Sequence, residues 1–224
     1  MIVGLYAAAI ILGYLIGSIP FGLILARMTV KTDIREVGSG KIGTTNVMRV
    51  AGRKVAAVAL VLDLAKGALT VVFAGLILGD NYPYMAQGLA GMAAIIGHTW
   101  SVFLGFKGGR GVATFIGGLL AMYWPAGTIG AIFIIGIGFR SRYMSLGSIT
   151  GAVTAFVYMM AVNILRIEFL EPHPPIEFVI YAMFGAIFIY VMHRDNIIRL
   201  VNGTERKIGE KATPRPTPSS TAYK

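Results

Sequence analysis

The sequence contains no cysteine, three histidines and only ten acidic residues in 224 positions. Without cysteine there are no disulfides and no thiolate chemistry, and so few scattered histidines and acids leave no plausible metal site. Charge is scarce as well, because 13% of the residues are charged against about 25% in soluble proteins. With 56% hydrophobic residues, this composition excludes an ordinary soluble enzyme and indicates a membrane protein.

Long apolar segments account for the hydrophobic fraction. A helix rises about 1.5 Å per residue, so a segment of about 20 residues can cross a hydrocarbon core about 30 Å thick. We therefore predict an all-α polytopic membrane protein with seven transmembrane helices. The predicted helices cover residues 2–26, 55–78, 84–105, 112–123, 125–139, 144–165 and 176–192.

Two prolines and several glycines predict irregularities in these helices. Pro20 lacks a backbone donor and should kink the first helix. Pro125 follows Tyr123 and Trp124, aromatic residues that suit a membrane interface, so we predict two short helices here with a break between them. The pairs Gly13/Gly17 and Gly147/Gly151 have the small-xxx-small spacing and predict close helix packing.

The basic residues predict the topology. With seven spans, 18 of the 20 lysines and arginines lie in loops on one side of the membrane. The positive-inside rule then places the N-terminus outside and the C-terminus in the cytoplasm. After about Thr204 the apolar pattern stops and a proline-rich segment follows. We predict a single transmembrane domain over residues 1–203 and a disordered cytoplasmic tail over residues 204–224.

A first glycine-rich segment, residues 37–49, precedes the second predicted helix. Its glycine spacing formally matches the dinucleotide fingerprint, but no strand precedes it, so we reject that function. Glycines let backbone N–H groups converge on an anion, which favours an anion site; a flexible basic loop against anionic lipid is the alternative. The candidate ligands are Gly38, Ser39, Gly40, Lys41, Gly43, Thr45, Asn46 and Arg49.

A second glycine-rich segment lies directly before the predicted helix at residue 112. Glycines and two cations there precede a helix N-terminus, which favours phosphate binding. Near its start, His98 could be either a packing residue or a ligand. The candidates are His98, Lys107, Gly108, Gly109, Arg110 and Gly111.

Two further pairs of polar residues stand out. His193 and Asn196 are three positions apart at the end of the last helix, hence on one helical face; interfacial anchoring is the alternative interpretation of this charged helix end. Asp63 and Lys66 lie inside the second predicted helix, where ionisable residues are costly unless paired. They could form a structural ion pair or take part in catalysis. We assign no role to His173 in the outer loop.

Taken together, these motifs resemble the acyl-phosphate-dependent glycerol-3-phosphate acyltransferase family, PlsY, over about residues 1–203. The resemblance implies a seven-helix bacterial inner-membrane enzyme with its active site facing the cytoplasm. It would transfer a fatty acyl group from acyl phosphate to the sn-1 hydroxyl of glycerol 3-phosphate, giving lysophosphatidic acid and phosphate in the first step of phospholipid synthesis. No cofactor, metal or nucleic acid is expected. Its partners would be its two substrates, the bilayer and the enzyme that makes acyl phosphate.

The resemblance also implies roles for individual residues. Ser39, Arg49, His193 and Asn196 would be catalytic. The sequence departs from the common family pattern at Lys41, Ser101, Arg110 and Asp195, where Asn, Pro, Lys and Glu are usual. A transporter or channel for a phosphorylated anion is the alternative function, but it should bind near mid-membrane on broken helices. The implied substrate-binding residues are Gly38, Gly40, Gly43, Thr45, Asn46, His98, Lys107, Gly108, Gly109, Arg110 and Gly111.

Overall fold

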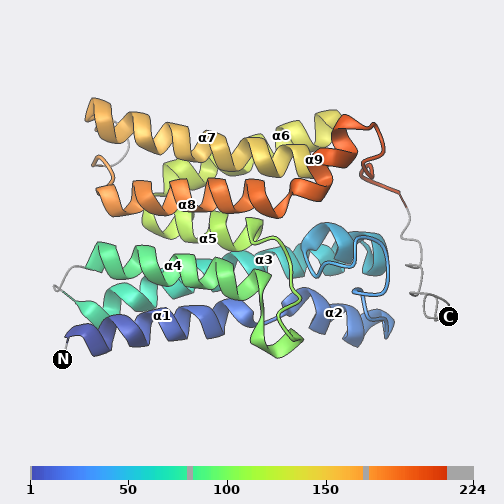
Figure 1. The fold of residues 1–224 in the computed structure, drawn as a ribbon, viewed down its shortest axis with the longest axis horizontal. Helices are drawn as coiled ribbons and strands as arrows, with labels where there is room; N and C mark the ends of the chain where they lie inside the picture. The colour runs from blue at the N-terminus through green and yellow to red at the C-terminus, as the bar shows by residue number, and fades with distance from the viewer. Residues whose placement is uncertain (1, 80–82, 169–171, 211–224) are drawn as a thin grey trace, which may run out of the picture.

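The computed structural model describes residues 2–79, 83–168 and 172–210, and this part of the chain is all-α (Figure 1). A short 3-10 turn, η1 (Val102–Leu104), follows the fourth helix. The helices are α1 (Ile2–Ser18), α2 (Phe21–Val30), α3 (Thr44–Leu78), α4 (Pro83–Thr99), α5 (Val112–Met122), α6 (Trp124–Ser141), α7 (Met144–Leu165), α8 (Ile176–Met192) and α9 (Arg194–Val201).

The predicted apolar segments fall on these helices, but not all of them are long enough to count as spans. Within the described residues, four helical segments are long and apolar enough to cross a bilayer: Ile2–Val30, Thr44–Leu78, Trp124–Ser141 and Met144–Leu165. The pair formed by α8 and α9, bent by 57°, makes a fifth if it is one span. By length and composition the structure therefore supports four or five spans, fewer than the seven predicted.

Proline residues break the helices where the sequence predicts. The predicted first helix is divided, because α1 ends at Ser18 and α2 begins at Phe21 after Pro20. The break between α5 and α6 falls at Tyr123, next to Pro125, which confirms two short helices in place of one. A third break was not predicted: Gly52 adopts φ +86° inside α3. Residues 44–51, which we assigned to a loop, form the helical turns that precede this break.

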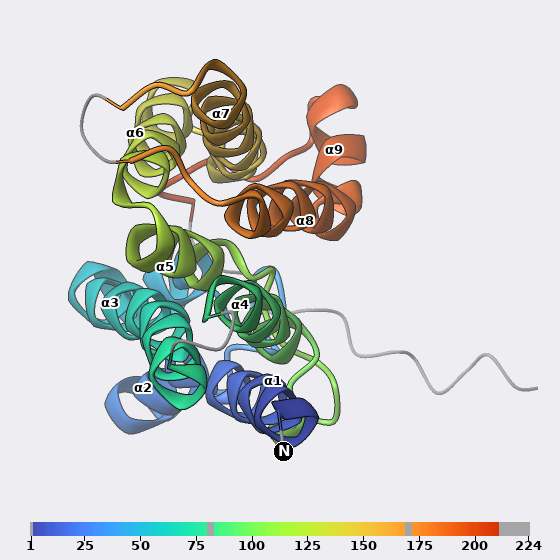
Figure 2. The same ribbon diagram turned by 90° about the vertical axis from the view of Figure 1, so that its left-hand side faces the viewer.

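The helices form two groups joined by α5. Figure 2 shows α1 to α4 on one side and α6 to α8 on the other, with the short helix α5 between them. Glycines allow the close contacts, as predicted. A Cβ at Gly17 would overlap the Ala94 backbone, and a Cβ at Gly147 would overlap the carbonyl of Ile134. These glycines therefore set the distances between α1 and α4 and between α6 and α7.

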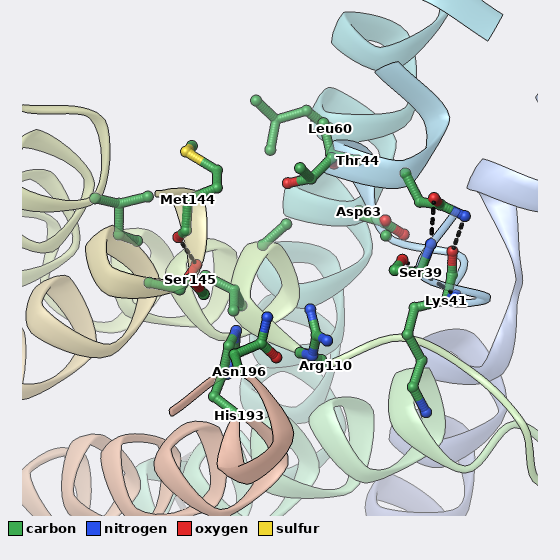
Figure 3. Close-up of a pocket in the computed structure, with 18 of the residues that line it drawn as sticks. Ser39, Lys41, Thr44, Leu60, Asp63, Arg110, Met144, Ser145, His193 and Asn196 are labelled. Carbon is green, nitrogen blue, oxygen red and sulfur yellow. Dashed lines mark hydrogen bonds between the residues drawn. The ribbon is translucent and has the colours of Figure 1, made fainter. Parts of the chain in front are cut away.

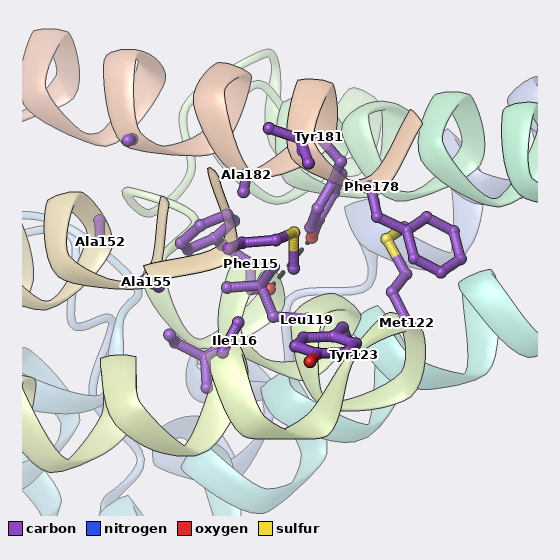
Figure 4. Packing of buried hydrophobic residues seen from close by; sticks show 14 of the residues in the cluster. Phe115, Ile116, Leu119, Met122, Tyr123, Ala152, Ala155, Phe178, Tyr181 and Ala182 are labelled. Atoms are coloured by element: carbon purple, nitrogen blue, oxygen red, sulfur yellow. Dashed lines mark hydrogen bonds between the residues drawn. The ribbon is translucent and has the colours of Figure 1, made fainter. Parts of the chain in front are cut away.

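The main hydrophobic core surrounds α5 (Figure 4). Phe115 and Tyr181 are fully buried, with ring centroids 5.6 Å apart. The Tyr181 hydroxyl donates to the Phe115 carbonyl at 3.1 Å, so its polar atom is satisfied inside the core. This packing fixes α5 against α8, and hence fixes the position of the loop that precedes α5.

Candidate active site

A cavity of about 260 Å³ lies beside the first turns of α3, α5 and α7 and the end of α8 (Figure 3). The ribbon in Figure 1 places these helix ends away from the N-terminus. Residues of α3, α5, α6 and α7 line the cavity together with residues that follow α8. One part of its wall is apolar and the other part is polar. The apolar wall consists of Leu60, Leu64, Ile116, Ala131, Ile134, Ile135 and Met144.

Two helix N-termini border the polar part. Gly43, Thr44 and Thr45 start α3, and Gly111 and Val112 start α5. First-turn amides of a helix have no partner within the helix, and the helix dipole is positive at this end. Two helix starts facing one cavity therefore favour an anionic ligand.

Cations outnumber acids around the polar part. The Nε atoms of Arg49 and Arg110 are buried and have no hydrogen-bond partner among the described residues. Burial lowers the pKa of the Arg110 guanidinium to about 10, although the negative charge of Glu205 partly opposes this shift. Arg110 therefore remains charged at neutral pH and lacks a contacting counter-ion in the described chain. The lining cations are Lys41, Arg49, Arg110, Arg199 and Arg206, and the lining acids are Asp63 and Glu205.

His193 is the first residue past the end of α8, and its side chain faces the cavity (Figure 3). Only 2% of it is exposed. Its Nδ1 lies 2.8 Å from the Ile189 carbonyl, which can only accept, so Nδ1 carries the proton and Nε2 is the acceptor. Burial lowers the pKa of this imidazole to about 3, and the Arg110 charge adds to the effect. His193 is thus neutral at pH 7.

Asn196 lies one turn after His193 and also lines the cavity, as the spacing predicts. Its Nδ2 donates to the Glu205 carboxylate at 2.7 Å. The same carboxylate accepts from Arg199 Nε at 2.8 Å and from the Ser145 hydroxyl at 3.1 Å. Because a carboxylate only accepts, the amide nitrogen of Asn196 must face Glu205. Its Oδ1 is buried and has no partner in the described part of the chain.

Residues 204–210, which we placed in the tail, pack against the domain. The Glu205 side chain is only 6% exposed, and the Ile208 amide donates to the Arg142 carbonyl at 2.8 Å. The chain thus stays attached to the helices at least as far as Ile208, and residues 211–224 of the predicted tail lie outside the described residues. Sequence reasoning missed Glu205, and the one signal available was an acid within a basic segment. It also missed Ser145, Ser148, Arg199 and Arg206 as lining residues.

The first glycine-rich segment is held together by Asn46, which is buried. Its Nδ2 lies 2.8 Å from the Ile34 carbonyl and 2.9 Å from that of Lys41, and its Oδ1 accepts from the Ser39 amide at 3.0 Å. Asn46 therefore organises the loop, a role we did not predict. Gly38 and Gly40 adopt φ +61° and +68°, so they supply turns and lie outside the cavity lining. Ser39, Gly43, Thr45 and Arg49 line the cavity as predicted.

The second glycine-rich segment differs from our expectation. The amides of Gly108 and Gly109 donate to the carbonyls of Thr99 and His98, each at 3.0 Å. These amides are therefore engaged with the end of α4, and Lys107 is exposed. Lys107, Gly108 and Gly109 lie outside the lining of this cavity, whereas His98, Arg110 and Gly111 belong to it.

The intramembrane pair is an ion pair. Lys66 Nζ lies 2.8 Å from Asp63 Oδ1, and both side chains are buried. The two residues therefore neutralise each other as the structural interpretation expects, and Asp63 also borders the cavity. Within the described ranges, no group of three or more His, Asp or Glu residues could hold a metal ion.

Comparisons with known proteins show which proteins this chain resembles. The family model for glycerol-3-phosphate acyltransferase matches residues 7–203. A glycerol-3-phosphate acyltransferase 3 of Dehalococcoides mccartyi is 45% identical, covering 95% of this chain and 100% of the relative. One of Rhodopseudomonas palustris is 40% identical, covering 93% and 99%.

The fold matches two crystal structures of PlsY, described as an integral membrane glycerol 3-phosphate acyltransferase. The glycerol 3-phosphate form superposes with a TM-score of 0.80 at 32% identity, covering 91% of this chain and 96% of that one. The lysophosphatidic acid form gives a TM-score of 0.78 at 31% identity, covering 90% and 94%.

Proposed function

This chain belongs to the glycerol-3-phosphate acyltransferase family, and we propose that it transfers a fatty acyl group from acyl phosphate to the sn-1 hydroxyl of glycerol 3-phosphate. The products are lysophosphatidic acid and phosphate, which makes the reaction the first step of membrane phospholipid synthesis. The observation that carries the proposal is a single cavity with an apolar wall and a cationic wall. Such a cavity suits a substrate pair that combines one acyl chain with two phosphates.

The acyl chain occupies the apolar part. Leu60 of α3 and Ile135 of α6 line the cavity, yet they are 39% and 55% exposed, so the apolar wall continues onto the outer surface between these helices. In a membrane that surface faces lipid. The acyl donor therefore enters sideways from the bilayer without crossing water.

The two phosphates occupy the polar part. Arg49 and Arg110 each offer an unpartnered, buried Nε–H, and a guanidinium binds phosphate oxygens in fork geometry. The N-termini of α3 and α5 add amides and positive dipole ends. The alternative, a transporter, is not favoured, because these groups gather at one end of the molecule and not at mid-membrane.

The acceptor hydroxyl attacks the carbonyl carbon of the acyl phosphate, and the bond from this carbon to the phosphate oxygen breaks. Phosphate leaves with the bonding electrons. His193 Nε2 accepts a hydrogen bond from the hydroxyl and orients it. The proton passes to a substrate phosphate, because a phosphate group with a second pKa of about 6 is a stronger base than an imidazole whose pKa is lowered to about 3. The proximity of the two substrates and the stabilisation of negative charge by the surrounding cations lower the activation barrier.

The same proposal includes the placement in the cell. The chain crosses the bacterial cell (inner) membrane seven times, with its N-terminus outside and its C-terminus in the cytoplasm. The excess of basic residues on the predicted cytoplasmic side supports this orientation. The cavity then faces the cytoplasm, where water-soluble glycerol 3-phosphate reaches it and where the enzyme that makes acyl phosphate supplies the donor.

One experiment tests the reaction. Purified protein receives glycerol 3-phosphate with acyl phosphate, and in a parallel reaction with acyl-CoA. We expect lysophosphatidic acid and one equivalent of phosphate from the first reaction only. Product from acyl-CoA alone would overturn the donor assignment. Uptake of glycerol 3-phosphate into liposomes without acylation would favour the transporter.

A further inference from the structure

Two buried ionisable residues border the cavity without a part in the reaction described above. Asp63 of α3 is 2% exposed and His98 of α4 is 3% exposed. Resting on the proposed function, we propose that Asp63 and His98 are positioning residues, which hold the loop before α5 so that Arg110 points its guanidinium at the substrate phosphate.

The first step is the anchoring of Asp63. Lys66 Nζ lies 2.8 Å from Asp63 Oδ1 and donates to the Ile19 carbonyl at 2.9 Å. That carbonyl lies at the break between α1 and α2, next to Pro20. One ammonium group therefore ties α3 to the end of α1 and holds the Asp63 carboxylate in place.

The second step is the orientation of the His98 ring. Its Nδ1 lies 3.6 Å from Asp63 Oδ1, which is too long for a hydrogen bond, and Nδ1 has no hydrogen-bond partner among the described residues. Its other nitrogen, Nε2, faces Gly109 so closely that a Cβ on Gly109 would overlap it. The ring therefore packs between the Asp63 carboxylate on one side and the backbone of the loop at Gly109 on the other.

The third step links the ring to Arg110. The Gly109 amide donates to the His98 carbonyl, and the Gly108 amide donates to that of Thr99. Arg110 follows directly. Its Nε has no partner in the described residues, so the loop backbone, against which the His98 ring packs at Gly109, sets the place of the guanidinium. Tilting the His98 ring would move Arg110 relative to the phosphate.

The proposal predicts a change in substrate affinity. His98→Ala removes the ring between Asp63 and the loop, and should raise the KM for glycerol 3-phosphate roughly tenfold or more, since displacing a binding group by about 1 Å can cost up to about 10²-fold. His98→Asn places an N–H where Nδ1 lies and should restore much of the affinity. Asp63→Asn should raise the KM as well.

A double-mutant cycle separates positioning from general loss of structure. If His98 acts through Arg110, His98→Ala should have little further effect on KM in an Arg110→Gln background. Independent effects of the two changes would overturn the proposal. His173→Ala, at the other end of the molecule, is the matched control and should leave KM unchanged.

Binding measurements keep the test separate from the proposed reaction. Calorimetric titration of each purified variant with glycerol 3-phosphate reports affinity without turnover, alongside its melting temperature. If the wild-type protein binds glycerol 3-phosphate but makes no lysophosphatidic acid, the proposed function is wrong. The double-mutant cycle can still be completed from the Kd values for glycerol 3-phosphate. If His98→Ala lowers the melting temperature and the folded fraction binds normally, His98 is only structural. Should His98→Ala fail to fold, Asp63→Asn or Gly109→Ala can replace it in the cycle with Arg110→Gln. Gly109→Ala serves this purpose because its added Cβ displaces the His98 ring.

Discussion

The Arg110 side chain is half-buried, no carboxylate contacts it within the described chain, and its lowered pKa of about 10 reflects that environment. Such a charge is costly until an anion binds it. We expect Arg110→Gln to lower kcat/KM for glycerol 3-phosphate about 10²-fold, equivalent to roughly 2.7 kcal/mol.

Arg110→Lys should retain part of this activity, because the charge remains while the planar fork is lost. Steady-state kinetics on the purified variants measure both effects. Arg140→Gln, at the end of α6 and outside the cavity lining, controls for the loss of one positive charge. Equal losses in the Arg110→Gln and Arg140→Gln variants would contradict the assignment.

The lowered pKa of His193 predicts how kcat/KM depends on pH. With its pKa lowered to about 3, the imidazole stays neutral from pH 7 down to pH 5, so its protonation cannot reduce the rate there. A substrate phosphate instead gains a proton near pH 6 and loses its capacity as a base. We expect kcat/KM to fall below about pH 6 in wild type and, from a lower plateau, in His193→Gln. Disappearance of this acidic limb in the variant would make His193 the base.

Residues of the site could be predicted where they belong to a short sequence motif. Ser39, Arg49, His193 and Asn196, which the family resemblance assigns to catalysis, all line the cavity, and their catalytic roles stay a prediction. The role of Asn46 was not predictable, because its amide meets carbonyls up to twelve positions away. Glu205 was missed for the same reason, since Ser145 lies 60 positions before it.

At the scale of the helices, Lys66 joins α3 to the break between α1 and α2. Removing its charge leaves Asp63 buried without its counter-ion, which typically costs about 3–5 kcal/mol. Lys66→Met should therefore lower the melting temperature of the detergent-solubilised protein strongly. Lys66→Met with Asp63→Asn should recover part of the loss, because no unpaired charge remains. A double variant as unstable as the single one would show that the bond to Ile19 matters more than charge pairing.

Helix breaks were predictable where a proline sits beside them, as at Pro20 and Pro125, because proline removes a donor and clashes with the preceding turn. The break at Gly52 was not. A glycine can continue a helix, and nothing in the neighbouring residues indicates that Gly52 instead adopts a φ of +86°. Tertiary contacts, which the local sequence does not encode, decide such a position.

At the scale of the whole molecule, the proposed orientation in the membrane can be tested by cysteine labelling. The chain has no native cysteine, so single-cysteine variants label cleanly. In intact cells, an impermeant maleimide should label His173→Cys and leave Glu210→Cys unlabelled until the membrane is permeabilised. The reverse pattern would invert the topology and place the cavity outside. Activity of both variants in membranes confirms that they are folded.

Leu60 and Ile135 line the cavity and are also partly exposed, and under the proposed function the surface that they share faces lipid. The acyl donor then comes from the bilayer, which is a two-dimensional phase, and glycerol 3-phosphate comes from bulk solution. The quantity that governs saturation by the acyl donor is its mole fraction in the bilayer, whereas glycerol 3-phosphate saturates by ordinary molarity. Adding inert lipid at constant total donor should slow the enzyme by surface dilution alone, and the single-chain product remains in the leaflet where it forms.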